Sequence, residues 1–96
     1  MQSPQRKHRF PVHWPLQYRP INEADWRPGR TVNISVSGVL FEAAEPLTAN
    51  ENVELSIMFQ APGRGVTSTF VRTGGHVVRS EPKVPARIAV KFSPTS

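Results

Sequence analysis

The chain of 96 residues has no cysteine, one tyrosine, two tryptophans and only seven acidic residues. Without cysteine it has neither a disulfide framework nor a thiolate nucleophile, which fits a reducing compartment. No apolar run approaches the roughly 20 residues that span a bilayer, and the first residues lack the apolar stretch of a signal peptide. These absences predict a cytoplasmic location and no membrane partner.

Patterns typical of catalysis and metal binding are also missing. The histidines, His8, His13 and His76, do not have the spacing of metal ligands, and no cysteine joins them. No serine, histidine and acid constellation has a supporting motif, and a domain of this size has no room for a separate catalytic module. We therefore expect a binding domain rather than an enzyme, with no catalytic residue, no metal and no cofactor.

Ten prolines and six glycines interrupt the chain at short intervals, so no long window has helical periodicity. An apolar side chain occupies every second position in residues 53–60 and again in residues 87–92. Further strand candidates are residues 12–18, 29–34, 39–43, 66–72 and 76–79. The side chains expected to face inward are Val53, Leu55, Ile57, Phe59, Ile88, Val90 and Phe92. This pattern predicts an all-β domain, a small antiparallel barrel of six to seven strands with little or no helix.

The whole chain, residues 1–96, is expected to form one domain. Residues 1–10 would be a flexible basic leader, residues 11–92 the barrel and residues 93–96 a tail. Pro15 predicts a distortion in the first strand, because proline lacks an N–H for the ladder. Ala61–Gly65 is typical of an exposed hairpin loop, and Thr73-Gly74-Gly75 of a turn or a bulge.

The net charge of +5 is unevenly distributed along the chain. Residues 1–22 hold four basic side chains and no acid, residues 23–60 hold six acids against two bases, and residues 61–96 hold six bases against one acid. A barrel that brings the two ends together would form one positive face, suited to a phosphate-bearing partner. Scattered arginines that only keep a small domain soluble are the simpler interpretation of the charge alone.

One hexapeptide, Asn33-Ile34-Ser35-Val36-Ser37-Gly38, lies between two strand candidates. By itself it is weak evidence, because asparagine, serine and glycine are ordinary turn residues. Together with the basic cluster Arg6-Lys7-His8-Arg9 and the closing residues 86–92, it resembles the PilZ domain family over nearly the whole chain. That family pairs an arginine motif, R-x-x-x-R, with a [D/N]-x-S-x-x-G turn to bind cyclic di-GMP.

The resemblance implies a set of ligand-binding residues at the two motifs. Arg6 and Arg9 would clamp guanine or phosphate, and Lys7 would contact phosphate. Asn33 and Ser35 would hydrogen-bond a base edge or phosphate, although both residue types also stabilise turns through their own backbone. Gly38 would allow a positive φ or a close backbone approach, a structural role.

The arginine spacing departs from the family pattern, because Arg6 lies three residues before Arg9 and Gln5 occupies the position four before it. The resemblance implies, as the preferred function, a cyclic di-GMP receptor that signals to an effector protein by rearranging its leader. The irregular spacing favours the alternative, a degenerate PilZ domain that does not bind the ligand and acts as a protein-interaction adaptor. A barrel that binds single-stranded nucleic acid would need exposed aromatic side chains. Phe59 and Phe92 fall on apolar faces instead, so nucleic acid is not the expected partner.

Overall fold

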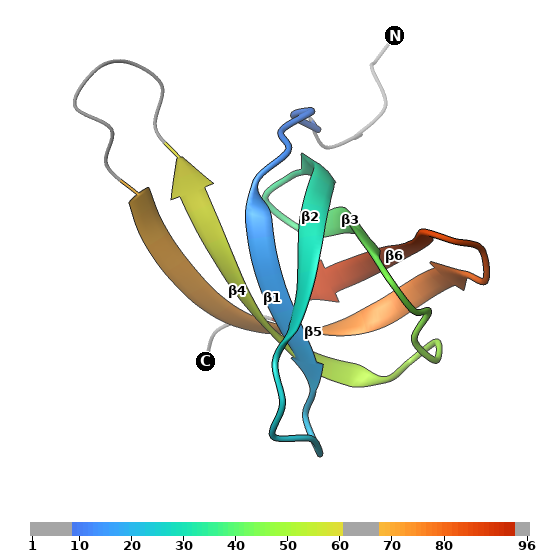
Figure 1. Ribbon diagram of the computed structural model, residues 1–96. Helices are drawn as coiled ribbons and strands as arrows, with labels where there is room; N and C mark the ends of the chain where they lie inside the picture. Colours follow the sequence, from blue (N-terminus) through green and yellow to red (C-terminus); the bar gives the residue numbers. More distant parts are fainter. Residues whose placement is uncertain (1–8, 61–67, 94–96) are drawn as a thin grey trace, which may run out of the picture.

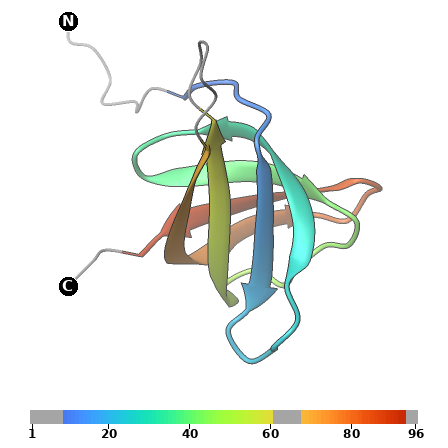
Figure 2. The ribbon, with the colours of Figure 1, turned by 60° about the vertical axis from the view of Figure 1, so that its left-hand side comes forward.

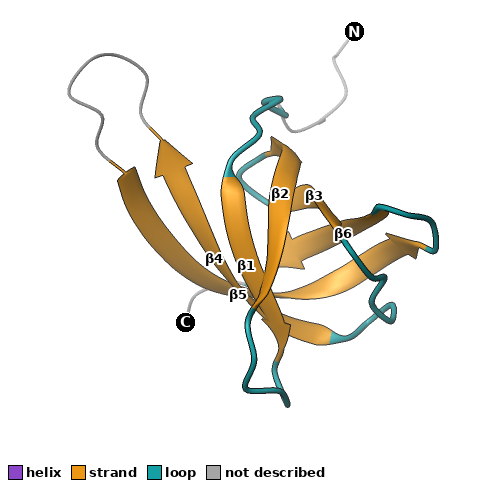
Figure 3. Cartoon of the chain, viewed as in Figure 1, coloured by secondary structure: helices purple, strands orange, loops and turns teal. Residues whose placement is uncertain are grey.

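Six strands form a closed antiparallel barrel in the computed structural model, which describes residues 9–60 and 68–93 (Figure 1). The strands are β1 (Pro15–Pro20), β2 (Arg27–Ile34), β3 (Gly38–Ala43), β4 (Asn52–Gln60), β5 (Ser68–Glu81) and β6 (Ala86–Phe92). Their order around the barrel is β1-β2-β3-β6-β5-β4, and β1 closes it by pairing with both β2 and β4. The described residues contain no helix (Figure 3), so the predicted all-β antiparallel barrel is confirmed.

The barrel interior is filled by alternate side chains from all six strands. At its centre the rings of Tyr18 and Phe41, both almost fully buried, lie 5.1 Å apart between centroids. Five of the side chains expected inside are buried, namely Val53, Leu55, Ile57, Ile88 and Val90. Phe59 and Phe92 are only partly buried and pack against this core at one end of the barrel.

The first strand is shorter than predicted, because β1 begins at Pro15 rather than at Val12. The first position of a strand accepts proline, since its missing N–H is not needed there. Before Pro15 the side chain of Thr31 adds to the backbone pairing: its hydroxyl donates to the carbonyl of Val12 and accepts the N–H of Trp14 at 2.7 Å, while the Thr31 N–H donates to the Trp14 carbonyl at 2.9 Å. The distortion expected at Pro15 takes this form.

The fifth strand is longer than predicted. Residues 68–81 form one strand, and Thr73-Gly74-Gly75 is neither a turn nor a bulge, because these residues pair in continuous register with β4. The expectation of two strands was wrong because Gly75 serves close packing: a Cβ there would lie 2.6 Å from the carbonyl oxygen of Lys91 in β6. Residues 61–67, with the expected loop at Ala61–Gly65, lie outside the described residues.

The loops divide between the two ends of the barrel. Because β1 and β2 are antiparallel neighbours, the β1–β2 loop, residues 21–26, lies at the end opposite the turn between β2 and β3 (Figure 2). In the β1–β2 loop, Trp26 has two guanidinium groups over its ring, those of Arg19 at 4.7 Å and Arg72 at 5.4 Å. Both arginines also pair with Glu54, which fixes this end of the molecule.

Candidate functional site

The turn between β2 and β3 is built from the serines of the hexapeptide. The N–H of Ser35 donates to the carbonyl of Gly38 at 2.9 Å, and the Ser35 hydroxyl accepts the N–H of Ser37 at 3.2 Å. The carbonyl of Ser37 in turn accepts the N–H of Phe92 from β6 at 2.8 Å. Ser35 is only 7% exposed, so its side chain lies within the turn rather than at the surface. Its hydroxyl stabilises the turn.

Gly38 begins β3 at a point where two backbones approach closely. A Cβ on this residue would lie 2.4 Å from the carbonyl oxygen of Val90 in β6, closer than real Cβ atoms come to other heavy atoms. Gly38 does not have a positive φ, so of the two structural roles expected for it the structure shows the close approach. The structural role of the third motif residue is therefore to bring β3 against β6.

The end of the leader is bound to this turn. Phe10 forms an antiparallel bridge with Ile34, in which the N–H of each residue donates to the carbonyl of the other at 2.8 and 3.0 Å. Beside the bridge, Nη1 of Arg9 donates to Oδ1 of Asn33 at 2.7 Å. The structure thus brings together one residue of each motif, although 24 positions separate them.

A β-bulge at Val32 determines the direction of Asn33. The register of β2 against β3 shifts between Thr31 and Asn33, so Val32 is an extra residue. Thr31 is buried inside the barrel, and without the bulge Asn33, two positions later, would point the same way. The extra residue reverses the alternation, so that Asn33 faces outward opposite Leu40 and Ile34 faces the core.

A row of outward side chains continues from Asn33 across the barrel surface. Register places Asn33 opposite Leu40, Leu40 opposite Ala89 and Ala89 opposite Arg79. A second bulge, between Val77 and Arg79, turns Arg79 outward in the same way, since Val77 is fully buried. We call these four side chains the outer row: Asn33, Leu40, Ala89 and Arg79. Its centre is apolar and partly buried, and its ends are polar and charged.

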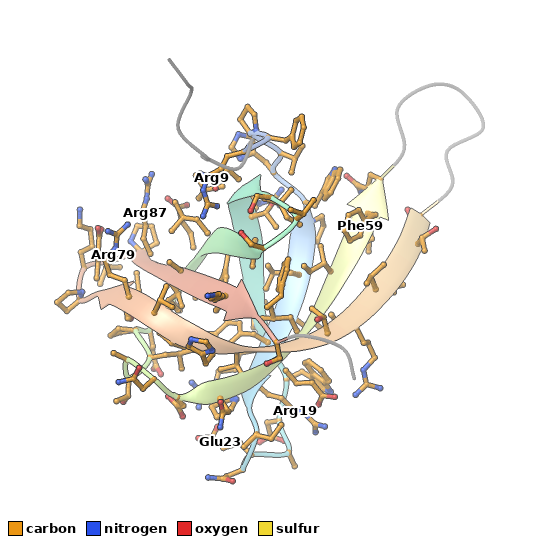
Figure 4. All side chains as sticks on the ribbon, turned by 180° about the vertical axis from the view of Figure 1, so that it is seen from behind. Arg9, Arg19, Glu23, Phe59, Arg79 and Arg87 are labelled. Carbon is orange, nitrogen blue, oxygen red and sulfur yellow. The ribbon has the colours of Figure 1, made fainter. Side chains whose placement is uncertain are left out.

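Basic side chains surround the outer row. Arg9 and Arg79 are exposed at its ends, and the exposed Lys91 lies directly opposite Gly38 in the β3–β6 pair. The nearby Glu42 is bound by Arg87 at 3.2 Å, so its charge is compensated. Figure 4 shows Arg9, Arg79 and Arg87 on one side of the molecule, with Arg19 and Glu23 at the other end. The site is therefore suited to an anionic ligand with a flat apolar part.

The predicted site residues fall into three groups. Arg6 and Lys7 lie outside the described residues. Arg9 and Asn33 contact each other at the surface, whereas Ser35 and Gly38 hold the turn beneath them. Sequence analysis missed the rest of the outer row, because only the register across β2, β3, β6 and β5 shows that these side chains are neighbours. The only sequence signal for these residues was that they occupy outward positions of strands near the hexapeptide.

Residues 9–60 and 68–93 hold no group of three or more histidine, cysteine or acidic side chains that could bind a metal ion. Within the same residues, no helix is long and apolar enough to cross a membrane.

An arginine-bearing leader fastened to an N-x-S-x-x-G turn on a six-stranded barrel defines a small β-barrel binding domain. Comparison with protein families matches residues 4–96 to the PilZ domain, so the chain belongs to the PilZ family, a family of cyclic di-GMP receptors. Domains of this family bind ligands and other proteins rather than catalyse reactions.

Among solved structures, the Bacillus subtilis inhibitor of motility, MotI/DgrA, is similar, with a TM-score of 0.69 and 23% sequence identity. The match covers 100% of this chain and 45% of that one, so the chain spans less than half the length of the MotI/DgrA structure. At this identity the likeness concerns the fold. No curated protein matches the chain.

Proposed function

We propose that this domain is a receptor for cyclic di-GMP that passes the signal to an effector protein. The observation that carries the proposal is the contact between Arg9 and Asn33, which joins the two family motifs beside the outer row. A contact of this kind places a guanidinium, an amide and an apolar surface within reach of one ligand.

The chemistry of the ligand fits these groups. Each guanine offers O6 and N7 as paired acceptors, which a planar guanidinium can meet together, and each phosphodiester carries one negative charge. Leu40 and Ala89 provide an apolar surface on which a purine could lie, and Arg79 and Lys91 lie beside it as exposed cations. Arg6 and Lys7 would add contacts from the leader.

Signal transfer would use the leader. A ligand that takes the guanidinium of Arg9 and the amide of Asn33 competes with the hydrogen bond between them, and the neighbouring bridge of Phe10 and Ile34 holds the same segment. A ligand shifts such an equilibrium only by its differential affinity for the two leader arrangements. Contacts of the ligand with Arg9 and Asn33, which form only when the bond between these residues is broken, would supply that difference. The rearranged leader would then meet the effector.

Calorimetric titration tests the ligand. Cyclic di-GMP is expected to bind, whereas GTP and a short oligonucleotide are not. Arg9→Ala should weaken binding by about 5- to 150-fold, because one bidentate guanidinium contact is worth roughly 1–3 kcal/mol. Arg72→Ala is the matched control, since it removes the same charge from the far side of the barrel. Equal losses of affinity in both variants would show that the effect comes from net charge and not from a specific contact of Arg9.

Variants that change the arginine spacing distinguish a cyclic di-GMP receptor from an adaptor that does not bind the ligand. Gln5→Arg restores R-x-x-x-R in register with Arg9 and should tighten binding if the first position is empty. Unchanged affinity in Gln5→Arg, together with a large loss in Arg6→Ala, would show that Arg6 already fills that position. If the native chain does not bind at millimolar ligand and Gln5→Arg creates binding, the domain is an adaptor that has lost its ligand and our proposal is wrong.

Hydrogen exchange tests the leader mechanism. The amides of Phe10 and Ile34 are both bonded in the bridge, so both should exchange slowly without ligand. We expect their exchange to change when cyclic di-GMP binds, while amides in the β1–β4 pair stay the same. Binding without any change at these two amides would exclude a leader rearrangement.

A further inference from the structure

The outer surface of the barrel carries a groove on the side away from the outer row. It encloses about 400 Å³ and runs over β2, β1, β4 and β5, whereas the outer row runs over β2, β3, β6 and β5. It is lined by the apolar side chains of Pro15, Pro28, Met58 and Phe70 and by the polar side chains of Gln17 and Ser56. The two surfaces therefore occupy different arcs of one closed barrel.

Two apolar side chains that line the groove, Met58 and Phe70, do not belong to the core. Met58 and Phe70 pair across β4 and β5 on the outward face, and Phe70 is 62% exposed. The barrel interior is already filled by the inward side chains of the same strands, such as Ile57. Outward positions of a strand are usually polar, and an exposed apolar patch with polar surroundings is typical of a surface that binds a partner.

Arg30 gives the groove its charge. It is exposed on the outward face of β2 opposite Pro15, and its Nη1 donates only to a backbone carbonyl, that of His13, at 3.1 Å. Its cross-strand neighbour Glu42 is bound by Arg87. In residues 9–60 and 68–93 no carboxylate pairs with Arg30, so this cation is available to an acidic group on a partner.

We propose that the groove binds a segment of a partner protein that presents a large apolar side chain next to a carboxylate. The apolar side chain would pack against the neighbouring side chains of Met58 and Phe70, and the carboxylate would reach Arg30. Charge complementarity selects this occupant over a basic segment, which Arg30 would repel. Binding here requires no cyclic di-GMP, so the failure of one proposal does not decide the other.

Selection of short random peptides displayed on phage tests the proposal with a defined probe. Peptides enriched on the native domain should pair a large apolar residue with Asp or Glu. On Arg30→Glu the same selection should enrich Lys or Arg in place of the acid. Phe70→Ser should weaken the selected peptides by about tenfold or more, equivalent to roughly 1.4 kcal/mol. Val84→Ser is the control, because Val84 is 89% exposed and lies outside this groove.

Several results would overturn the proposal. One is enrichment of peptides without a preference for acidic residues. Another is equal affinity of the selected peptides for the native domain and for Phe70→Ser. A third is a native dimer, seen by sedimentation, that Phe70→Ser converts to a monomer. The last result would make a second copy of the chain the occupant. Thermal unfolding checks that the variants fold. If Phe70→Ser does not fold, Met58→Ser removes the neighbouring apolar side chain of the same groove instead.

Discussion

Replacing Gly38 by alanine should destabilise the whole barrel. A methyl group on Gly38 would lie 2.4 Å from the Val90 carbonyl oxygen, and real Cβ atoms essentially never come within 3.0 Å of such an atom. β3 and β6 would have to separate by at least the difference, 0.6 Å. The obstacle is backbone rather than a flexible side chain. Overpacking of this kind costs about 1–3 kcal/mol, which lowers the melting temperature of a domain this size by roughly 4–24 °C.

Thermal unfolding followed by circular dichroism measures this effect, and Gly74→Ala is the matched control. A Cβ on Gly74, which also lies inside a strand, meets only the carbonyl oxygen of Val53 at 3.8 Å, an ordinary contact. Because glycine in a strand is itself unfavourable by about 0.5–1 kcal/mol, Gly74→Ala should leave the melting temperature unchanged or raise it. Native stability of Gly38→Ala, or equal losses in the two variants, would refute the steric reasoning.

Three further predictions concern side chains of known environment. Asn33→Ala should weaken cyclic di-GMP binding with little change in melting temperature, whereas Ser35→Ala should also lower stability by about 1 kcal/mol, because its buried hydroxyl is bonded within the turn; calorimetry and thermal unfolding separate the two. Burial raises the pKa of Tyr18, the only tyrosine, so the folded state holds the phenol proton more tightly and stability falls as the pH rises through the folded pKa. Phenolate absorbance should appear only above the ordinary tyrosine range, and its appearance within that range in folded protein would contradict this. The hydrogen bond from Arg19 lowers the pKa of Glu54, so its contribution is lost as the pH falls through that lowered pKa. Glu54→Gln should therefore flatten the melting temperature profile below roughly pH 5, and an unchanged profile would exclude this ion pair as a source of acid sensitivity.

The strands could be predicted where apolar residues recur at every second position. The prediction failed at the glycine pair of β5, because glycine occurs both in turns and where two strands approach closely. In β4 and β6 a period of two identified both the strand and its buried face, because every second side chain is apolar and contacts the core. In β5 the pair Gly74-Gly75 has the composition of a turn, yet Gly75 is required by the approach of β6. Local composition does not distinguish a turn glycine from a packing glycine, since the packing partner of Gly75 lies in β6, more than ten positions away in the sequence.

The candidate site was predictable only in part for a related reason. The hexapeptide and the basic cluster could be recognised as a pair, but the outward direction of Asn33 depends on the bulge at Val32. Val32 and Val78 are ordinary strand residues, so nothing in their type predicts the extra position. The neighbours Leu40 and Arg79 follow from the register of four strands, which is a property of the closed barrel.

The two tryptophans of the chain are placed at opposite ends of the barrel. Trp14, just before β1, packs on Phe59 with ring centroids 4.7 Å apart, close to where the leader is fastened. Trp26 lies in the β1–β2 loop under the guanidinium of Arg19. Intrinsic fluorescence therefore provides two unlabelled reporters. The Trp26→Phe variant reports from Trp14, beside the leader, and the Trp14→Phe variant reports from Trp26, about a strand's length away. A ligand that alters the emission of Trp14 alone acts locally, and one that alters the emission of both tryptophans reorganises the entire barrel.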